Sequence, residues 1–158
     1  MNKYLRNTAL LFFSCSLTLL AYDAQTAQVL DKSFSVMTHE RLAKGVSKVS
    51  ADRVMEMLRN GDDFTLLDIR TPGERSVIAI AVKNTVAIPV NLLFKKKNLD
   101  KLPANKLLIV VCYSGSRAQQ AAAGLRAIGF KNVKVLKGGL KALANSDSSK
   151  NAPIIKNH

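Results

Sequence analysis

Short apolar runs alternate with helix-like stretches through the middle of the chain. The run Leu107 to Val111 is continuously apolar, as is typical of a strand buried on both faces. Helical spacing follows in the small or apolar residues Ala118, Ala121, Ala122, Leu125 and Ile128. An earlier helical stripe consists of Ala51, Val54, Met55 and Leu58. Ser50 is a suitable N-cap for that earlier helix and Gly61 a suitable stop, so the pattern predicts a helix ending near Asn60.

The predicted strands and helices follow one another along the chain. We expect strands at about residues 65–69, 85–88, 107–112 and 133–136, with a short turn or helix after Pro89 and a long helix ended by Gly129. This alternation predicts an α/β fold with a mainly parallel sheet covered by helices on both faces. Ligands of such sheets bind at the carboxyl ends of the strands. Cys112 and Asp68 both lie at such ends, so we expect them to meet in space.

Residues 1–27 have the pattern of a secretory signal peptide. Lys3 and Arg6 precede the apolar run Thr8 to Ala21, and small and polar residues follow. This run of about 14 residues is shorter than the ~20 that a membrane-spanning helix needs. We therefore expect a cleaved signal and a periplasmic or secreted protein, with a retained membrane anchor as the alternative. The candidate cleavage sites follow Ala21, Ala24 and Ala27.

The chain contains two cysteines, and cleavage would leave one of them. Cys15 lies inside the predicted signal peptide. Ser14-Cys15 is weakly similar to a lipoprotein processing site, but the apolar stretch before it is too short, so we expect no lipidation. Cys112 alone could not form an intramolecular disulfide, and an unpaired thiol in an oxidising compartment is a candidate reactive group.

The rest of the chain has room for one domain and carries a strong positive charge. The net charge is +13 over all 158 residues and would be +12 without residues 1–27, which contain Lys3, Arg6 and Asp23. This charge favours small anions, an anionic membrane surface or an acidic partner by long-range steering. No nucleic-acid motif is present, and no nucleic-acid partner is expected. His39 and His158 have no metal-ligand spacing, so we expect neither a metal nor a cofactor. We assign residues 28–45 to a lead-in that is partly ordered at best, 46–144 to the domain and 145–158 to a flexible tail.

The segment from Val111 to Arg117 is the strongest candidate for chemistry. It places Cys112 where a buried strand meets a Ser/Gly turn and then a helix. In such a unit the loop amides and the positive end of the helix dipole converge on the centre of the loop. A thiolate is stabilised in that position. The alternative is a buried structural cysteine.

Three segments, in the same order along the chain, resemble rhodanese-like sulfurtransferases. Cys112 to Arg117 resembles the six-residue active-site loop of that family, which begins with cysteine and ends with arginine. Leu66 to Glu74 resembles the family's strand ending in Asp-x-Arg, followed by proline and an acidic residue. Gly129 to Gly139 resembles its Gly-Phe turn, strand and double glycine. The resemblance covers about residues 46–144 and implies a rhodanese-like three-layer fold.

The resemblance implies sulfur transfer through Cys112 as the nucleophile. A Cys112 persulfide would move a sulfane sulfur from thiosulfate, polysulfide or a persulfide donor to a thiol or cyanide-type acceptor, which could be a protein. Loop residues expected to hold the anion or the donor are Tyr113, Ser114, Gly115, Ser116 and Arg117. We expect a monomer. Alternatives are a non-turnover sulfur carrier or partner-binding domain, and a phosphatase, whose related loop is one residue longer.

Residues outside the loop are given supporting roles. By analogy with the family, Asp68 helps to shape the cysteine loop, or it accepts ordinary turn hydrogen bonds. We expect Arg70 to form a surface ion pair with Asp68 or Glu74, with substrate contact as the alternative. Gly138-Gly139 is expected to be a plain turn, or else to serve backbone geometry near the site.

Three departures from the family pattern bear on the donor. Tyr113 stands where the family often has a basic residue, which weakens the case for thiosulfate over polysulfide or a protein persulfide. The segment Val77 to Val82 replaces the usual Gly-His-Ile, and Leu140 replaces a tryptophan after the double glycine. None of these changes removes the nucleophile or its loop.

Overall fold

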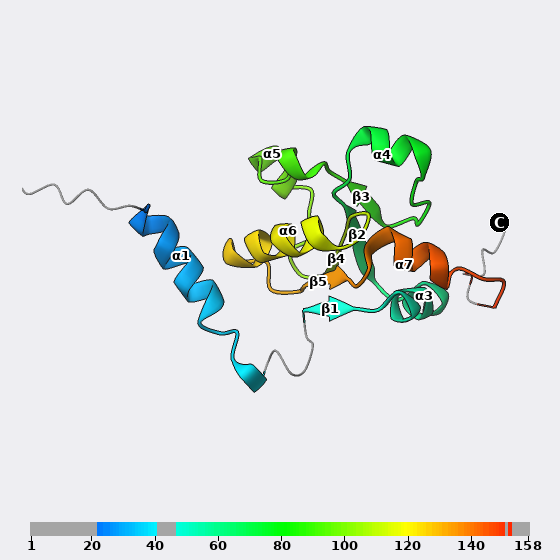
Figure 1. The fold of residues 1–158 in the computed structure, drawn as a ribbon, viewed down its shortest axis with the longest axis horizontal. Helices are drawn as coiled ribbons and strands as arrows, with labels where there is room; N and C mark the ends of the chain where they lie inside the picture. The colour runs from blue at the N-terminus through cyan, green and yellow to red at the C-terminus, as the bar shows by residue number, and fades with distance from the viewer. Residues whose placement is uncertain (1–21, 41–46, 151, 153–158) are drawn as a thin grey trace, which may run out of the picture.

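The computed structural model describes residues 22–40, 47–150 and 152 (Figure 1). Within these residues, five parallel strands form one sheet in the order β1-β5-β4-β2-β3. The strands are β1 (Lys48–Val49), β2 (Phe64–Asp68), β3 (Thr85–Ala87), β4 (Leu107–Val111) and β5 (Val133–Leu136). The predicted α/β fold with a parallel sheet is confirmed, and the four predicted strands lie within one residue of their expected bounds.

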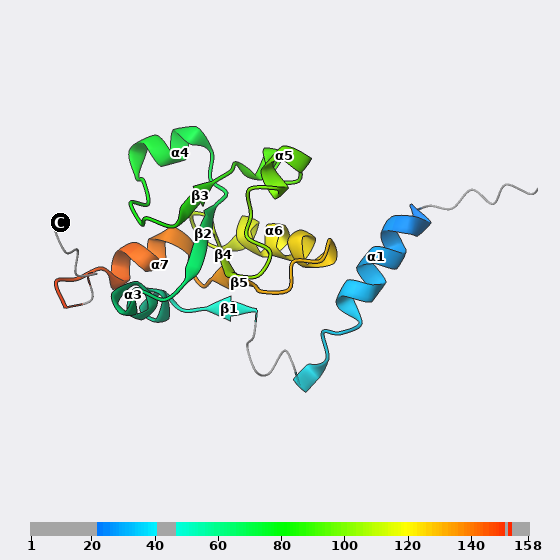
Figure 2. The ribbon, with the colours of Figure 1, turned by 180° about the vertical axis from the view of Figure 1, so that it is seen from behind.

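Helices cover both faces of the sheet (Figures 1 and 2). On one face lies α6 (Ser116–Ala127), and on the other α3 (Ala51–Asn60) and α7 (Gly139–Ser146) pack side by side. Strand β4 contributes to the hydrophobic cores on both faces of the sheet, because its successive side chains point to opposite faces. Leu108 and Val110 pack with α6, while Ile109 and Val111 pack with α3 and α7. Further helices are α1 (Ala24–Phe34), α4 (Pro72–Val77), α5 (Lys96–Leu99) and the 3-10 helix η1 (Val90–Leu92).

The two ends of α3 are formed as predicted. The Ser50 side chain accepts a hydrogen bond from the Arg53 amide at 3.3 Å, which satisfies one of the free amides of the first turn. Gly61 ends the helix in the left-handed conformation, with φ of 70°. These caps orient α3 so that Val54 and Met55 are buried against the sheet.

Helix α7 corrects the boundary that we gave to the flexible tail. Asn145 and Ser146, which we placed in the tail, belong to the last turn of α7. The Ser146 hydroxyl donates to the Asp52 carboxylate on α3 at 2.9 Å, and this contact extends the packing of the two helices. Residues 151 and 153–158 of the predicted tail lie outside the described residues.

Helix α1 crosses the boundary between the predicted signal peptide and lead-in. The Asp23 side chain caps it by accepting the Thr26 amide at 2.6 Å, and its alanines favour helix. We expected residues 28–45 to be partly ordered at best, whereas residues 28–34 form part of a helix. Residues 1–21, which hold most of the predicted signal peptide and Cys15, lie outside the described part, as do 41–46. Among the described residues, no helix combines the length and the apolar character needed to cross a bilayer.

A matched pair of isoleucines tests the packing of the sheet. Ile109 on β4 is fully buried, whereas Ile128 after α6 is 50% exposed. Ile109→Ala should lower the free energy of unfolding by about 2–5 kcal/mol, because it removes apolar contacts and leaves a cavity. Ile128→Ala should cost less than about 1 kcal/mol, since its side chain is already half in water. Urea unfolding of both variants measures the difference, and equal losses would contradict the assigned core.

Candidate active site

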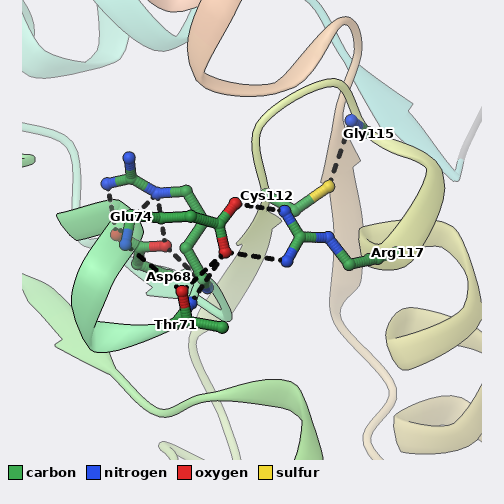
Figure 3. Close-up of polar contacts among 7 residues, drawn as sticks. Asp68, Thr71, Glu74, Cys112, Gly115 and Arg117 are labelled. Atoms are coloured by element: carbon green, nitrogen blue, oxygen red, sulfur yellow. Dashed lines mark hydrogen bonds and ion pairs between the residues drawn. The ribbon is translucent and has the colours of Figure 1, made fainter. Parts of the chain in front are cut away.

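Cys112 directly follows β4 at the carboxyl edge of the sheet. The preceding residue, Val111, pairs with Asp68 at the end of β2. The Cys112 side chain is only 1% exposed, and its Sγ accepts a hydrogen bond from the Gly115 amide at 3.1 Å (Figure 3). Gly115 has φ of 105° and is the N-cap of α6. The sulfur therefore lies at the amino end of a helix, where the first amides have no acceptor within the helix.

Helix α7 holds the cysteine loop from its other side. The Leu140 amide donates to the Cys112 carbonyl at 2.8 Å, and the Lys141 amide donates to the Tyr113 carbonyl at 3.2 Å. Gly139 permits this approach, because a Cβ there would lie 2.5 Å from both carbonyl oxygens. Its φ of 62° also suits glycine. Gly139 therefore serves the geometry of the cysteine loop, which supports the alternative that we gave for Gly138-Gly139 over a plain turn.

The other residues of the predicted loop differ in their exposure to solvent. Gly115 is buried, whereas Tyr113, Ser114 and Ser116 are exposed at the surface. Tyr113 is 52% exposed, so its ring lies at the rim of the loop. The six residues from Cys112 to Arg117 thus run from the end of β4 through a short loop into the first turn of α6.

Arg117 forms an ion pair with Glu74 of α4 (Figure 3). Nη1 donates to Oε2 at 2.9 Å, and Nη2 donates to Oε1. This hydrogen-bonded pair is the main reason that the pKa of Glu74 falls to about 2, with the Thr71 amide lowering it further. The pKa of Arg117 is raised, mainly by Glu74 and to a smaller extent by the nearby Cys112.

The partner of Arg117 was missed by sequence reasoning, which offered Glu74 to Arg70. Glu74 lies at the start of a short helix and 43 residues before Arg117, and no periodic pattern connects them. The sequence around Glu74 indicated only its contact with a neighbouring residue in the chain. A threonine three residues before a glutamate is a capping-box pattern, and Thr71 and Glu74 do cap α4 in this way.

Asp68 and Arg70 form a buried pair rather than the surface pair that we expected. Each is about 1% exposed. Arg70 donates to Asp68 through Nε at 2.9 Å, through Nη2 at 2.7 Å and through its own amide at 3.0 Å. The pair is buried because Asp68 ends β2, which is covered on both faces, and Arg70 follows two residues later. Both carboxylate oxygens of Asp68 accept hydrogen bonds from Arg70. This end of β2 contacts the residue before Cys112 through the backbone, because the Ile69 amide donates to the Val111 carbonyl at 3.0 Å.

The described ranges contain no group of three or more His, Cys, Asp or Glu side chains that could hold a metal ion. Cys112 is a free thiol in this part of the chain. The chemistry available at the site is that of one sulfur atom, the amides around it and one paired guanidinium. Such a site can stabilise an anion on or beside the sulfur.

Comparison with known proteins places this arrangement in a family. The sequence profile described as Rhodanese-like domain matches residues 50–146. The chain is 28% identical over 99 residues to a protein of Allochromatium vinosum named "Sulfurtransferase", covering 63% of this chain and 89% of that protein. The crystal structure of a rhodanese-related protein from Thermoplasma volcanium aligns with a TM-score of 0.53 at 26% identity, covering 68% of this chain and 96% of that one.

A longer relative matches over one part of its length. The chain is 30% identical over 102 residues to "Probable adenylyltransferase/sulfurtransferase MoeZ" of Mycobacterium tuberculosis. The match covers 65% of this chain and 25% of that protein. The chain therefore spans about a quarter of the length of this relative.

Alanine substitutions at two glycines with positive φ distinguish the cost of backbone strain from the cost of crowding the cysteine loop. Gly61→Ala should cost about 1–2 kcal/mol, because it introduces left-handed strain in open space. Gly139→Ala should cost clearly more, since its Cβ must also push the carbonyls of Cys112 and Tyr113 apart from α7. Thermal unfolding measures the cost, and thiol alkylation of the folded variants measures access to Cys112. Only Gly139→Ala should speed alkylation, and equal behaviour of the two variants would contradict the contact.

The low pKa of Glu74 predicts a pH-dependent stability. Its folded value of about 2 lies below the ordinary 4.5, so ionised Glu74 favours the folded state. This contribution is fully present above pH 4.5 and is lost as the pH falls through 2. The difference in free energy of unfolding between wild type and Glu74→Gln should shrink across this window. Urea unfolding at several pH values measures it, and a constant difference would refute the pairing with Arg117.

Proposed function

This chain belongs to the rhodanese-like domain family, and we propose that it is a sulfurtransferase acting through a persulfide on Cys112. The donor is thiosulfate, polysulfide or a persulfide, and the acceptor is a thiol or a cyanide-type molecule. The observation that carries the proposal is the position of the Cys112 sulfur. It lies at the amino end of α6, accepts the Gly115 amide at 3.1 Å and shares its loop with Arg117.

The reaction proceeds as two displacements. In the first, the Cys112 thiolate attacks the outer sulfur of the donor, the donor S–S bond breaks, and the leaving group departs with the electron pair. In the second, the acceptor attacks the terminal sulfur of the persulfide, and Cys112 leaves as a thiolate. Covalent catalysis divides one transfer into two steps in this way. No metal or redox cofactor enters either step.

The loop supports both steps by holding negative charge. The Gly115 amide already faces the sulfur, and the first amides of α6 supply further donors near it. Arg117 orients the donor or fixes the loop, as its position beside Cys112 allows. Tyr113 adds no positive charge at the rim, which favours polysulfide or a protein persulfide over thiosulfate as the physiological donor.

We also propose that the protein works outside the cytoplasm. The proposal rests on the sequence pattern of residues 1–27, with its basic start and its apolar run. The intact mass of the chain recovered from the periplasm or the medium tests it. A mass that matches cleavage after Ala21, Ala24 or Ala27 supports the proposal, and a full-length chain found in the cytosolic fraction refutes it.

Cys112→Ser tests the mechanism. The variant should keep its fold, because serine is of similar size, and should lose all sulfur transfer to cyanide. Mass spectrometry of the wild type after incubation with polysulfide should show one added sulfur on Cys112, which cyanide removes.

The control is Asp63→Asn, at an exposed residue just before β2 and at the end of the strands away from Cys112, and it should keep Cys112 loading within about threefold, a small change in barrier height. Turnover by Cys112→Ser would contradict the mechanism. A wild type that forms the persulfide but passes it to no small acceptor would favour the sulfur carrier over the enzyme.

A further inference from the structure

The ion pair at the rim of the cysteine loop brings a carboxylate next to the proposed donor site. Both terminal nitrogens of Arg117 donate to Glu74, so the end of the guanidinium that faces Glu74 is occupied, and three of its five N–H groups remain for other acceptors. The two side chains are 38% and 33% exposed. The pair is therefore partly open to solvent, and molecules arriving from solution meet the negative charge of Glu74 together with the positive charge of Arg117.

Glu74 is held in this position from behind. Its Oε2 atom accepts the Thr71 amide and the Thr71 hydroxyl, each at 3.0 Å, and the Glu74 amide donates back to Thr71 at 3.2 Å. Moving the carboxylate away from Arg117 would therefore also disturb the cap of α4. Glu74 acts as a fixed charge at the site rather than as a freely moving surface side chain.

Building on the sulfur transfer proposed above, we infer that Glu74 makes the site selective for sulfur donors that carry a single negative charge. The Glu74 carboxylate offsets the positive charge that Arg117 offers to an incoming anion. A doubly charged donor is also repelled about twice as strongly by this carboxylate as a singly charged donor at the same distance. The favoured class comprises hydropersulfide anions and other monoanions with a terminal sulfane sulfur, so among the donors proposed above a persulfide is preferred over thiosulfate and over dianionic polysulfide. Glu74 is a positioning residue, because it acts through Arg117.

Two donors that differ by one charge isolate this effect. Thiosulfate is a dianion, and Cys112 thiolate takes its outer sulfur to give the persulfide anion and sulfite dianion. Methanethiosulfonate is a monoanion in which a methyl group replaces one oxyanion, and the same step gives the persulfide anion and methanesulfinate. In both reactions one S–S bond forms, one breaks, and the electron pair leaves with the sulfur-oxygen group. Charge and atoms balance in each.

The experiment measures the rate of persulfide formation on Cys112 with each donor in wild type and Glu74→Gln. Glutamine keeps an oxygen for the Thr71 amide and removes the charge. The variant should react at least about tenfold faster with thiosulfate, whereas the methanethiosulfonate rate should change less than about threefold, as expected for one charge removed near a dianion. The control Asp63→Asn breaks the ion pair with Lys106 at the opposite edge of the sheet and should change neither rate. An unchanged ratio of the two rates in Glu74→Gln overturns the inference.

A second measurement separates this inference from the proposed function. If wild type forms no persulfide with either donor or with polysulfide, sulfur transfer itself is refuted. Sulfate titration of Cys112→Ser, followed by NMR, still reports on anion binding at Arg117 without any turnover. Adding Glu74→Gln to that variant should tighten sulfate binding at least about tenfold, by the same removal of charge. Equal affinity in the two proteins would overturn the role of Glu74.

Discussion

The geometry of the site depends on the backbone contact between the cysteine loop and α7. The carbonyls of Cys112 and Tyr113 are both taken up by amides of α7. In a trans peptide the carbonyl and the following amide point in opposite directions, so the amides of Tyr113 and Ser114 face away from α7. The contact thus determines which polar groups of the loop are available to a ligand. It exists because Gly139 has no side chain to keep the two segments apart.

The two arginine-carboxylate pairs near this loop have different physical roles. Asp68 and Arg70 are sealed from water and satisfy each other at the end of β2, and a charge left alone there would be very costly. Glu74 and Arg117 lie at the surface, where water lowers the cost of separating them. The first pair belongs to the framework of the sheet. The second can exchange partners with a ligand, and Figure 3 shows it closest to the cysteine loop.

Much of the framework was predictable from sequence because it follows local patterns. Continuous apolar runs identified the strands, and Ser50 and Gly61 marked the ends of α3. Helix α7 was not predicted, because it starts at a glycine without a side-chain cap. Strand β1 was not predicted either, because it has only two residues. Within the site, the loop was recognised from its residue types. Its contacts with Glu74 and α7 were not, because they join segments distant in the chain and leave no periodic signal.

The burial of the Cys112 thiol has a consequence for how sulfur would be delivered. With 1% of the side chain exposed, bulky disulfides and large electrophiles have poor access to Sγ. In the proposed persulfide, the added sulfur atom would lengthen the side chain by about 2 Å, the length of an S–S bond. The atom offered to an acceptor would then be the transferred sulfur, while Sγ would stay buried. An acceptor would therefore reach the transferred sulfur of the loaded protein more easily than the thiol of the unloaded protein.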